Sequence, residues 1–250
     1  MQCSNCGSRM QDGLAGWHFV CVHCGLEAST LEPADLTTSD AVVDEADREV
    51  GLETLRKASF ATTFDLLRKQ VSRGRLLDVG CAHGWFLDAG RDAGFQCTGI
   101  EPSVQVAAQG MSRGHEVLTG YFPSVVAGRQ PFDVISFNDV FEHIPHADQT
   151  MEAASGLLAP GGVLSIAIPS NNGVFYRLSR MFARVGMPGP FERMWQKQFS
   201  SPHLYYFKAD VLVTMASRHG LQLVHRSHLP SVRREGLWDR LSYDTSSGLV

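Results

Sequence analysis

Long apolar runs, a secretion leader and an excess of positive charge are all missing from this chain of 250 residues. No apolar run approaches the ~18 residues that a helix needs to cross a bilayer. The N-terminus has no basic segment followed by an apolar one, so no secretory signal is expected. The net charge of −4 argues against a protein that works chiefly by binding nucleic acid or an anionic membrane. We therefore expect a cytoplasmic protein without a membrane partner.

The common phosphate-binding fingerprints are also absent, because the chain contains neither G-x-G-x-x-G nor G-x-x-x-x-G-K-[ST]. Internal repeats and low-complexity tracts are missing as well. What the chain does have is a hydrophobic content of 44%, which is enough for a sizeable core. The length then favours one large domain, or one domain with a small appendage.

Four of the six cysteines form the pattern C-x2-C-x14-C-x2-C near the N-terminus. They are Cys3, Cys6, Cys21 and Cys24. Disulfides are not expected in a reducing compartment, whereas two such pairs are typical of a tetrahedral zinc–thiolate site. Residues 1–26 resemble a zinc ribbon. Four thiolates leave no open coordination position, so we expect a structural zinc ion rather than a catalytic one. Four free thiols are the alternative.

Residues 27–50 carry eight acids, among them Glu27, and a single base, Arg48. They show little periodicity until about Asp40, which is typical of an exposed connector. From about Leu52, apolar residues recur at helical spacing and predict a helix ahead of the first buried strand. The expected division is a ribbon over 1–26, an acidic linker over 27–50 and a main domain over 51–250.

The most informative stretch is LLDVGCAHG at residues 76–84. An apolar strand leads into a tight loop of small residues, and an apolar helix follows from Trp85. Gly80 and Gly84 carry no Cβ and Ala82 carries only a methyl group, so a ligand can lie against the backbone. The free N–H groups at the start of the helix suit a carboxylate or a phosphate. The stretch predicts a nucleotide-cofactor site, and the strand-to-helix turn of any α/β protein is the alternative.

Three further segments follow in the order that an alternating α/β domain requires. CTGIE at 97–101 predicts a strand that ends in Glu101, 23 residues after Asp78. That separation is close to the ~20-residue offset at which a carboxylate meets ribose hydroxyls in dinucleotide folds. FDVISF at 132–137 predicts an apolar strand that runs into Asn138, and LLAPGGVLSI at 157–166 predicts a helix end, a turn and a strand.

Together these segments resemble motif I, the second-strand acid, motif IV and the L-x-P-G-G turn of the class I S-adenosylmethionine-dependent methyltransferases. The family usually has glycine in motif I where this chain has Ala82. The resemblance implies S-adenosylmethionine as the cofactor and Glu101 as the ligand of its ribose diol. The candidate cofactor-binding residues are Asp78, Gly80, Cys81, Ala82, His83, Gly84, Phe86, Glu101, Pro102, Ser103, Tyr121, Phe122 and Asn138. For the two aromatic residues, core packing is the alternative to contact with adenine. For the Cys81 thiol, apolar packing is expected rather than nucleophilic chemistry.

The expected fold is α/β, with a mostly parallel, doubly wound sheet of the seven-stranded methyltransferase type and a small N-terminal zinc ribbon. Strands are expected at 75–79, 96–100, 116–118, 133–137, 163–168 and 221–227. Helices are expected at 85–93, 103–113, 147–158 and 209–219. This alternation predicts helices on both faces of the sheet and ligands at the carboxyl ends of its strands. A seventh strand has no clear signal in residues 240–250.

Candidate catalytic side chains follow the strand at 133–137, where the resemblance places the reactive methyl group. Methyl transfer is an in-line displacement, so the protein must align the acceptor and, for an oxygen nucleophile, remove its proton. Because histidine ordinarily titrates near neutrality, His143 is the candidate base, with Asp139 and Glu142 beside it.

The same D-x-x-E-H run resembles the E-x-x-E-H run of the ubiquinone-pathway O-methyltransferases. That likeness implies a divalent ion held by Asp139, Glu142 and His143. The Glu-His pair also resembles that of zinc-binding sugar C-methyltransferases, in which it assists deprotonation. A loop in which Glu142 and His143 only satisfy backbone groups is the alternative.

Residues 170–207 are expected to form an insertion that acts as a lid or acceptor site, since long loops in compact domains are usually functional. The segment SPHLYYF at 201–207 resembles the acceptor-lining stretch of methyltransferases from glycan and natural-product pathways. That likeness implies contact between His203 and the acceptor, and a turn histidine is the alternative. The aromatic residues Tyr176, Phe191 and Trp195 give the insertion its lid-like character.

A basic helix is expected inside this insertion, because Arg177, Arg180 and Arg184 fall at i, i+3 and i+7 with apolar residues on the other face. The arginines suit the phosphate of a substrate such as a nucleotide sugar. A solvated helix face is the alternative.

The favoured function is methylation of a small-molecule acceptor, with oxygen preferred over carbon or nitrogen. An RNA methyltransferase with an RNA-binding ribbon is the second candidate, although Arg9 is the only Arg or Lys up to residue 24 and RNA binding needs a positive surface. A non-catalytic scaffold that keeps the cofactor fold is the third. The sequence indicates neither the acceptor nor the oligomeric state.

Overall fold

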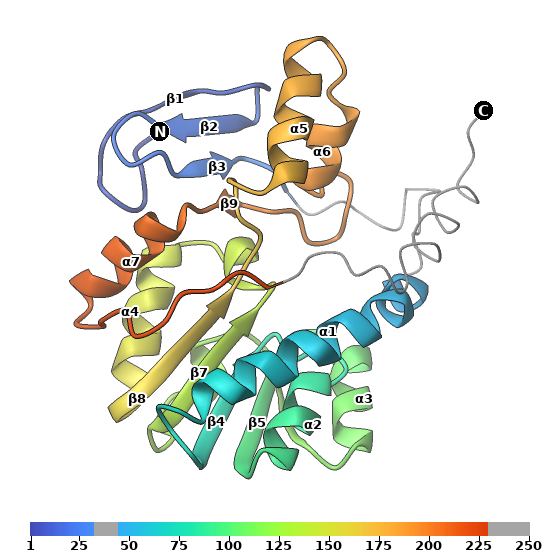
Figure 1. The fold of residues 1–250 in the computed structure, drawn as a ribbon, viewed down its shortest axis with the longest axis vertical. Coiled ribbons are helices and arrows are strands. Elements are labelled where there is room, and N and C mark those ends of the chain that lie inside the picture. Colours follow the sequence, from blue (N-terminus) through green and yellow to red (C-terminus); the bar gives the residue numbers. More distant parts are fainter. Residues whose placement is uncertain (33–44, 230–250) are drawn as a thin grey trace.

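The computed structural model describes residues 1–32 and 45–229, and its main body is a parallel sheet flanked by helices (Figure 1). Five strands are hydrogen-bonded in the order β6–β5–β4–β7–β8, and every neighbouring pair is parallel. Their bounds are β4 Gly74–Val79, β5 Phe95–Glu101, β6 Glu116–Thr119, β7 Phe132–Asn138 and β8 Leu158–Ala167. The predicted α/β class and its parallel sheet are confirmed, with β4 in the centre.

Helices cover both faces of this sheet. The helices of the main domain are α1 Glu45–Leu67, α2 Trp85–Asp92, α3 Val104–Ser112, α4 Ala147–Leu157 and α7 Ala209–Arg218, with short 3-10 turns η1 Ser124–Val126 and η2 Phe141–His143. On one face, Phe86 of α2 packs against Phe60 and Phe64 of α1, with ring centroids 5.1 Å and 4.7 Å apart. On the other face, Met151 of α4 and Met215 of α7 lie in a separate core with Phe137.

The strand expected at 221–227 does not form, and this prediction is wrong. These residues follow α7 without a ladder to β8, and Leu223 and Val224 are exposed. A strand needs a neighbour to pair its N–H and C=O groups, and the described residues offer no partner beyond β8. The sheet therefore has five strands within the described residues, and residues 240–250 lie outside them.

A second, antiparallel sheet of four short strands contains the N-terminal ribbon. Its strands are β1 Met10–Asp12, β2 His18–Cys21, β3 Glu27–Ser29 and β9 Tyr205–Tyr206. β3 pairs with β9, so that Glu27 lies opposite Tyr206. The ribbon thus continues past residue 26 and takes its last strand from the insertion, and residues 27–29 do not belong to an exposed connector.

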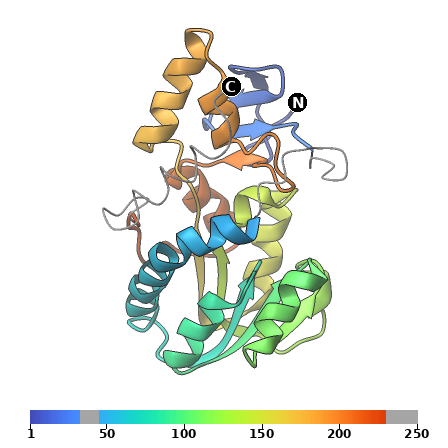
Figure 2. The same cartoon turned by 90° about the vertical axis from the view of Figure 1, so that its right-hand side faces the viewer.

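The insertion contributes two helices, α5 Val174–Arg184 and α6 Gly189–Met194, which stand at the end of the molecule next to the ribbon. Figures 1 and 2 show both helices beside the ribbon sheet, at the end of the molecule away from the parallel sheet. The ribbon itself rests on the main domain, because Cys3 and Leu26 share a core cluster with Val211 of α7. Within the described residues, no helix is long and apolar enough to span a bilayer.

Candidate functional site

The loop after β4 has the backbone shape that its small residues favour. Gly80, Ala82 and Gly84 all have left-handed backbones, with φ of +74°, +45° and +81°. A Cβ at Gly80 would lie 2.4 Å from a methyl carbon of Val140, so only glycine fits there. Ala82 holds a conformation that is uncommon for a residue with a Cβ. The N–H groups of Gly80 and Cys81 both donate to the carbonyl of Ile100, which ties the loop to the end of β5.

Asp78 is buried at the carboxyl end of β4. Its Oδ1 accepts hydrogen bonds from Ser136 Oγ at 2.7 Å and Asn138 Nδ2 at 3.0 Å. Burial raises the pKa of Asp78 to about 7, the two hydrogen bonds oppose this rise and the charge of Glu101 adds to it. The carboxyl group is thus poised to ionise near neutral pH, when a cationic group of a ligand would favour its charged form.

Glu101, at the carboxyl end of β5, is held by the backbone on both of its oxygens. Oε2 accepts from the N–H of Ala82 at 3.2 Å, and Oε1 accepts from the N–H of Ser103 at 3.0 Å. Ser103 in turn caps α3, because its Oγ accepts the N–H of Val106. The carboxylate is therefore fixed beside the loop, and a carboxylate is a group that accepts the hydroxyl protons of a diol.

A narrow cleft beneath α1 is lined by the loop and by Asp78, whereas Glu101 is not one of its lining residues. Seven of the predicted cofactor residues line it, namely Asp78, Gly80, Cys81, Ala82, His83, Phe86 and Asn138. The cleft is also lined by Arg56 and Phe60 of α1, Trp85 of α2, and Asp139. The helical periodicity of α1 includes Phe60, but nothing in the sequence singled out Arg56.

Four predicted cofactor residues lie elsewhere or play another part. Tyr121 is 73% exposed, and Phe122 packs edge-on against Phe137 with ring centroids 5.6 Å apart. The two alternatives for these aromatic residues are contact with adenine and packing in the core. Phe122 therefore packs in the core. Pro102 is exposed, and burial and the neighbouring charges of Asp78 and Glu101 raise the pKa of the Cys81 thiol. That thiol is a packing group, as its sequence context predicts.

The predicted catalytic run after β7 is split by the backbone at Asp139. Asp139 has a left-handed backbone, with φ of +53°, and its side chain is 54% exposed, 3.8 Å from the guanidinium of Arg56. Glu142 is buried in η2. The described side chains that converge with metal-ligand spacing are Glu142, His143 and His203, without Asp139. The structure thus contradicts the predicted divalent site at Asp139, Glu142 and His143.

The hydrogen bonds of His143 define which ring nitrogen is basic. Its Nδ1 lies 2.9 Å from the carbonyl oxygen of Pro202, which can only accept, so Nδ1 carries the proton. Nε2 is then the nitrogen that can take a proton, and it lies 3.9 Å from Oε1 of Glu142. The ring is partly exposed at 15%, and its centroid is 4.6 Å from that of His203.

Glu142 and His203 are both buried beside this ring. Within the described residues, neither carboxyl oxygen of Glu142 has a hydrogen-bond partner. Burial, together with the charge of Asp139, raises the pKa of Glu142 well above its usual value. Backbone contacts hold the pair together, because the N–H of Leu204 donates to the carbonyl of Glu142 at 2.9 Å.

The ribbon reaches this site through the backbone of His203. Ser29 Oγ, at the end of β3, donates to the His203 carbonyl at 2.7 Å. The N–H of His203 donates to the carbonyl of Trp195 at 3.0 Å. The backbone of His203 is therefore hydrogen-bonded to both the ribbon and the insertion. Nothing in the sequence indicates that Ser29 contacts this site.

A buried polar network locks the insertion onto the ribbon. Glu27 accepts from His18 Nε2 at 2.9 Å, from the hydroxyl of Tyr176 at 2.6 Å, and from Asn171 and Arg180 at 3.2 Å each. Burial alone would raise the pKa of Glu27, but these hydrogen bonds and the charge of Arg180 hold it below its usual value. The N–H of Leu14 donates to Nδ1 of His18 at 2.9 Å, which leaves Nε2 as the nitrogen that donates to Glu27. Nothing in the local sequence indicates that Glu27 is buried.

The aromatic side chains of the insertion complete the same contact. Phe191 stacks on Trp17 of the ribbon with ring centroids 5.7 Å apart, and Trp195 lies edge-on to Trp17 at 5.6 Å. Tyr176 stacks on Tyr206 at 4.2 Å. The predicted lid aromatics are thus buried against the ribbon, so they give the insertion a fixed base.

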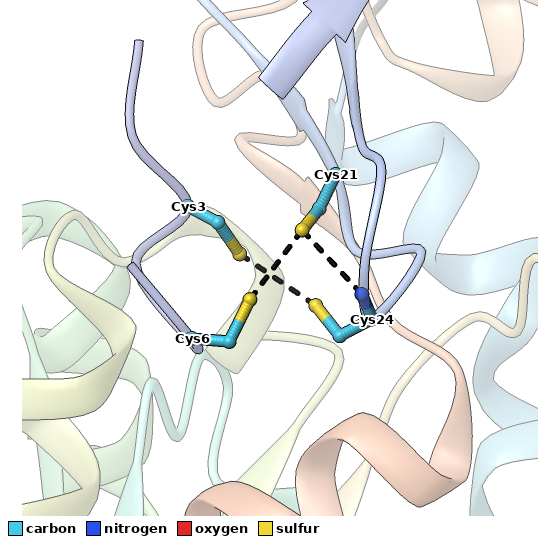
Figure 3. A group of neighbouring side chains, drawn as sticks. All are labelled: Cys3, Cys6, Cys21 and Cys24. Atoms are coloured by element: carbon cyan, nitrogen blue, oxygen red, sulfur yellow. Dashed lines mark hydrogen bonds between the residues drawn. The ribbon is translucent and has the colours of Figure 1, made fainter. Parts of the chain in front are cut away.

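The four N-terminal cysteines point toward one another (Figure 3). Sulfur–sulfur distances are 3.6 Å between Cys3 and Cys24 and 3.5 Å between Cys6 and Cys21, and all four sulfurs lie within 4.8 Å of each other. Tetrahedral zinc with Zn–S bonds of ~2.3 Å separates its sulfurs by about 3.8 Å. The geometry and the soft thiolate donors therefore fit a zinc ion.

Comparison with known proteins agrees with this fold. The methyltransferase domain family matches residues 51–226. A ubiquinone biosynthesis O-methyltransferase of Bordetella pertussis is 30% identical over 161 residues, which are 61% of this chain and 64% of that protein. The C-methyltransferase NovU of Streptomyces niveus is 25% identical over 60% of this chain and 33% of that protein. The chain thus spans less than two thirds of the length of these relatives.

Solved structures share the fold at low sequence identity. The putative methyltransferase complexed with the Trm112 activator of Haloferax volcanii superimposes with a TM-score of 0.57 at 17% identity, over 74% of this chain and 77% of that one. A possible histamine N-methyltransferase of Thermotoga maritima superimposes with a TM-score of 0.54 at 18% identity, over 72% and 77% of the two chains. Since the family match covers most of the chain and agrees with the sheet, the loop and the cleft, this chain belongs to the methyltransferase domain family.

Proposed function

We propose that this protein transfers the methyl group of S-adenosylmethionine to a small-molecule acceptor, with a hydroxyl oxygen favoured and His143 as the general base. The observation that carries the proposal is the fixed tautomer of His143. Its Nδ1–H is held by Pro202, so the basic Nε2 is presented beside the end of β7. A positioned base of this kind contributes typically 10²–10⁴-fold to a rate.

The residues at the ends of β4 and β5 fit the cofactor. Two backbone N–H groups fix Glu101 in a position that suits the ribose diol, and the carboxylate of Asp78 can pair with a positive charge of the cofactor. When bound, S-adenosylmethionine supplies an activated methyl group on a sulfonium, which leaves as a neutral thioether. The protein needs no acid for that departure, so its own residues have to orient the acceptor and remove a proton.

The site offers a nitrogen, Nε2 of His143, that can take the proton of an oxygen acceptor. An acceptor hydroxyl gives its proton to His143 Nε2 as its oxygen bonds to the methyl carbon and the carbon–sulfur bond breaks. The imidazolium that forms lies near the Glu142 carboxyl, whose charged form the new positive charge favours. Buried beside both groups, His203 is a candidate acceptor contact.

A divalent ion held by Glu142, His143 and His203 is a second candidate for the same three side chains, because their ligand atoms lie within 4.8 Å of one another. In that case Nε2 of His143 would be a ligand rather than a base, and the ion would lower the pKa of the acceptor hydroxyl. Activity that survives dialysis against a chelator favours the base. Activity that is lost and then restored by one divalent metal favours the ion.

The names of the relatives support a small-molecule acceptor, since they include O-methyltransferases of ubiquinone biosynthesis, a trans-aconitate 2-methyltransferase and a C-methyltransferase. RNA remains the alternative acceptor, with the ribbon as its binding site. The burial of one ribbon face against α5 and α6 weighs against it, because that face is not open to a nucleic acid.

We also propose that the four thiolates hold one structural zinc ion.

Turnover and cofactor binding together test the proposal. Transfer of labelled methyl from S-adenosylmethionine is measured on a panel of phenols, carboxylic acids, sugars and a transcribed RNA, and binding of S-adenosylhomocysteine is measured by calorimetry. His143→Ala should lower turnover on an oxygen acceptor about 10²-fold or more and leave product affinity unchanged. His225→Ala, which removes an exposed histidine, is the matched control. Wild-type turnover in His143→Ala would refute the assigned base, and absence of cofactor binding would favour a scaffold.

A further inference from the structure

The outward face of α5 carries exposed apolar side chains, and the helix itself stands at one end of the molecule (Figure 2). Fourteen large hydrophobic side chains are exposed among the described residues, and half of them lie in residues 174–187. They are Val174, Phe175, Leu178, Met181, Phe182, Val185 and Met187. Scattered exposed apolar residues need no explanation, but a contiguous patch of this kind marks an interaction surface.

The fold itself does not use this face. Tyr176 and Ser179, on the inward side, are buried against the ribbon and hold the helix in place through Glu27. The spacing of the exposed set, at positions such as 174, 178, 181, 182 and 185, places it along the opposite side of the helix. The helix is therefore fixed by its polar side and presents its apolar side to a partner.

Charge indicates which partner. α5 contains three arginines and no acid, and residues 172–200 hold five bases and one acid in a chain of net charge −4. Arg177 and Arg184 are exposed and flank the apolar stripe, whereas Arg180 pairs with Glu27. An isologous contact between two copies of α5 would bring these arginines together, which disfavours a second copy of the chain.

We propose that α5 binds the surface of an anionic lipid membrane, with its apolar side in the interface and Arg177 and Arg184 against lipid phosphates. Basic residues beside an apolar helix face are the features of interfacial helices. Both views place α5 at the far end of the molecule from the parallel sheet, so a flat surface reaches it without meeting the main domain. The negative net charge of the chain does not exclude this contact, because the positive charge is concentrated where the apolar face lies.

Co-sedimentation of the whole protein with lipid vesicles tests the proposal independently of catalysis. The protein should bind vesicles that contain phosphatidylglycerol, bind neutral phosphatidylcholine vesicles far less, and be released as salt screens the arginines. Phe175→Ser with Phe182→Ser should reduce partitioning about tenfold or more. Arg177→Gln with Arg184→Gln should reduce it by a similar factor, at roughly 1 kcal/mol per arginine.

Matched controls distinguish binding through this face of α5 from non-specific binding to vesicles. Val104→Ser with Met111→Ser removes exposed apolar side chains from α3, and Arg68→Gln with Arg73→Gln removes two exposed charges. Both controls should bind anionic vesicles as the unaltered chain does, and all variants should keep their melting temperatures. No binding to anionic vesicles, equal loss in the controls, or a concentration-dependent dimer that the Phe175 and Phe182 variants abolish would overturn the proposal.

Discussion

The carboxylate of Glu27 accepts a 2.6 Å hydrogen bond from the hydroxyl of Tyr176, a residue 149 positions later in the chain. This bond ties the ribbon to the insertion. The same two segments also meet at β3 and β9, and Ser29 of β3 holds the backbone of His203. The ribbon is thus a support for one wall of the candidate active site.

Tyr176→Phe tests this support. The substitution removes a hydrogen bond to a charged, buried acceptor, so we expect it to lower the free energy of unfolding by about 1.5–3 kcal/mol. Because the lost bond joins two segments, protease cleavage within 170–200 should also become faster. Tyr121→Phe, at a tyrosine that is 73% exposed, is the control and should change neither quantity. Equal denaturation midpoints for Tyr176→Phe and the unaltered protein would show that the network adds no stability.

What the sequence could predict follows from the range of the interactions involved. The loop at 80–84 and the helices around it depend on neighbouring residues, and small residues at a strand end leave few alternative conformations. The four cysteines are found from their spacing alone, because a C-x2-C pair presents two thiolates from one turn. The sequence can predict these features because they depend on residues that are close together in the chain.

The missed features depend on contacts between distant residues. Glu27 looks like one more acid of an acidic connector, and only its pairing with β9 and its four donors explain its burial. Asp139 fits an acidic metal ligand by spacing, but its left-handed backbone turns it toward Arg56. The strand expected at 221–227 has suitable residues, yet it lacks a partner among the described strands.

The raised pKa of Asp78 predicts how stability changes with pH. The folded-state pKa of about 7 lies above the ordinary value of 3.8, so the folded protein binds more protons than the unfolded chain between these values. The stability that Asp78 contributes is therefore fully present below pH ~4 and is lost as pH rises to ~7, by about 4 kcal/mol at most. Asp78→Asn keeps an oxygen for Ser136 and Asn138 and should be more stable than the unaltered protein at pH 8, but similar to it at pH 4.5.

Urea unfolding at both pH values measures this effect, and S-adenosylhomocysteine titration measures its functional counterpart. Asp78→Asn should bind the product more weakly, because it lacks the negative charge that would pair with the product's ammonium group. A variant that is no more stable at pH 8 would place the pKa of Asp78 near its ordinary value instead.

Glu101 should matter for cofactor binding. Glu101→Ala removes the acceptor proposed for the ribose diol, and we expect the affinity for S-adenosylhomocysteine to fall by about 1–3 kcal/mol. Glu116→Ala is the matched control, because Glu116 begins the neighbouring β6 and binds Thr98 and Arg129 away from the cleft. Calorimetry on both variants decides the matter, and equal affinities would remove Glu101 from the cofactor site.

Zinc content is the most direct test of the ribbon. We expect one zinc ion per chain in protein purified without chelators, and Cys6→Ser should lower this content, because a thiolate ligand is lost. Cys6 is exposed, so its replacement leaves no cavity and any loss of stability reports the metal.

Since Cys3 and Cys21 lie in the same core cluster as Val211 and Met215, loss of the metal should also lower the melting temperature of the main domain. Ser4→Ala, at an exposed neighbour, controls for the surface change, and Cys97→Ser controls for the loss of a thiol. A zinc content near zero in the unaltered chain would contradict the ribbon assignment.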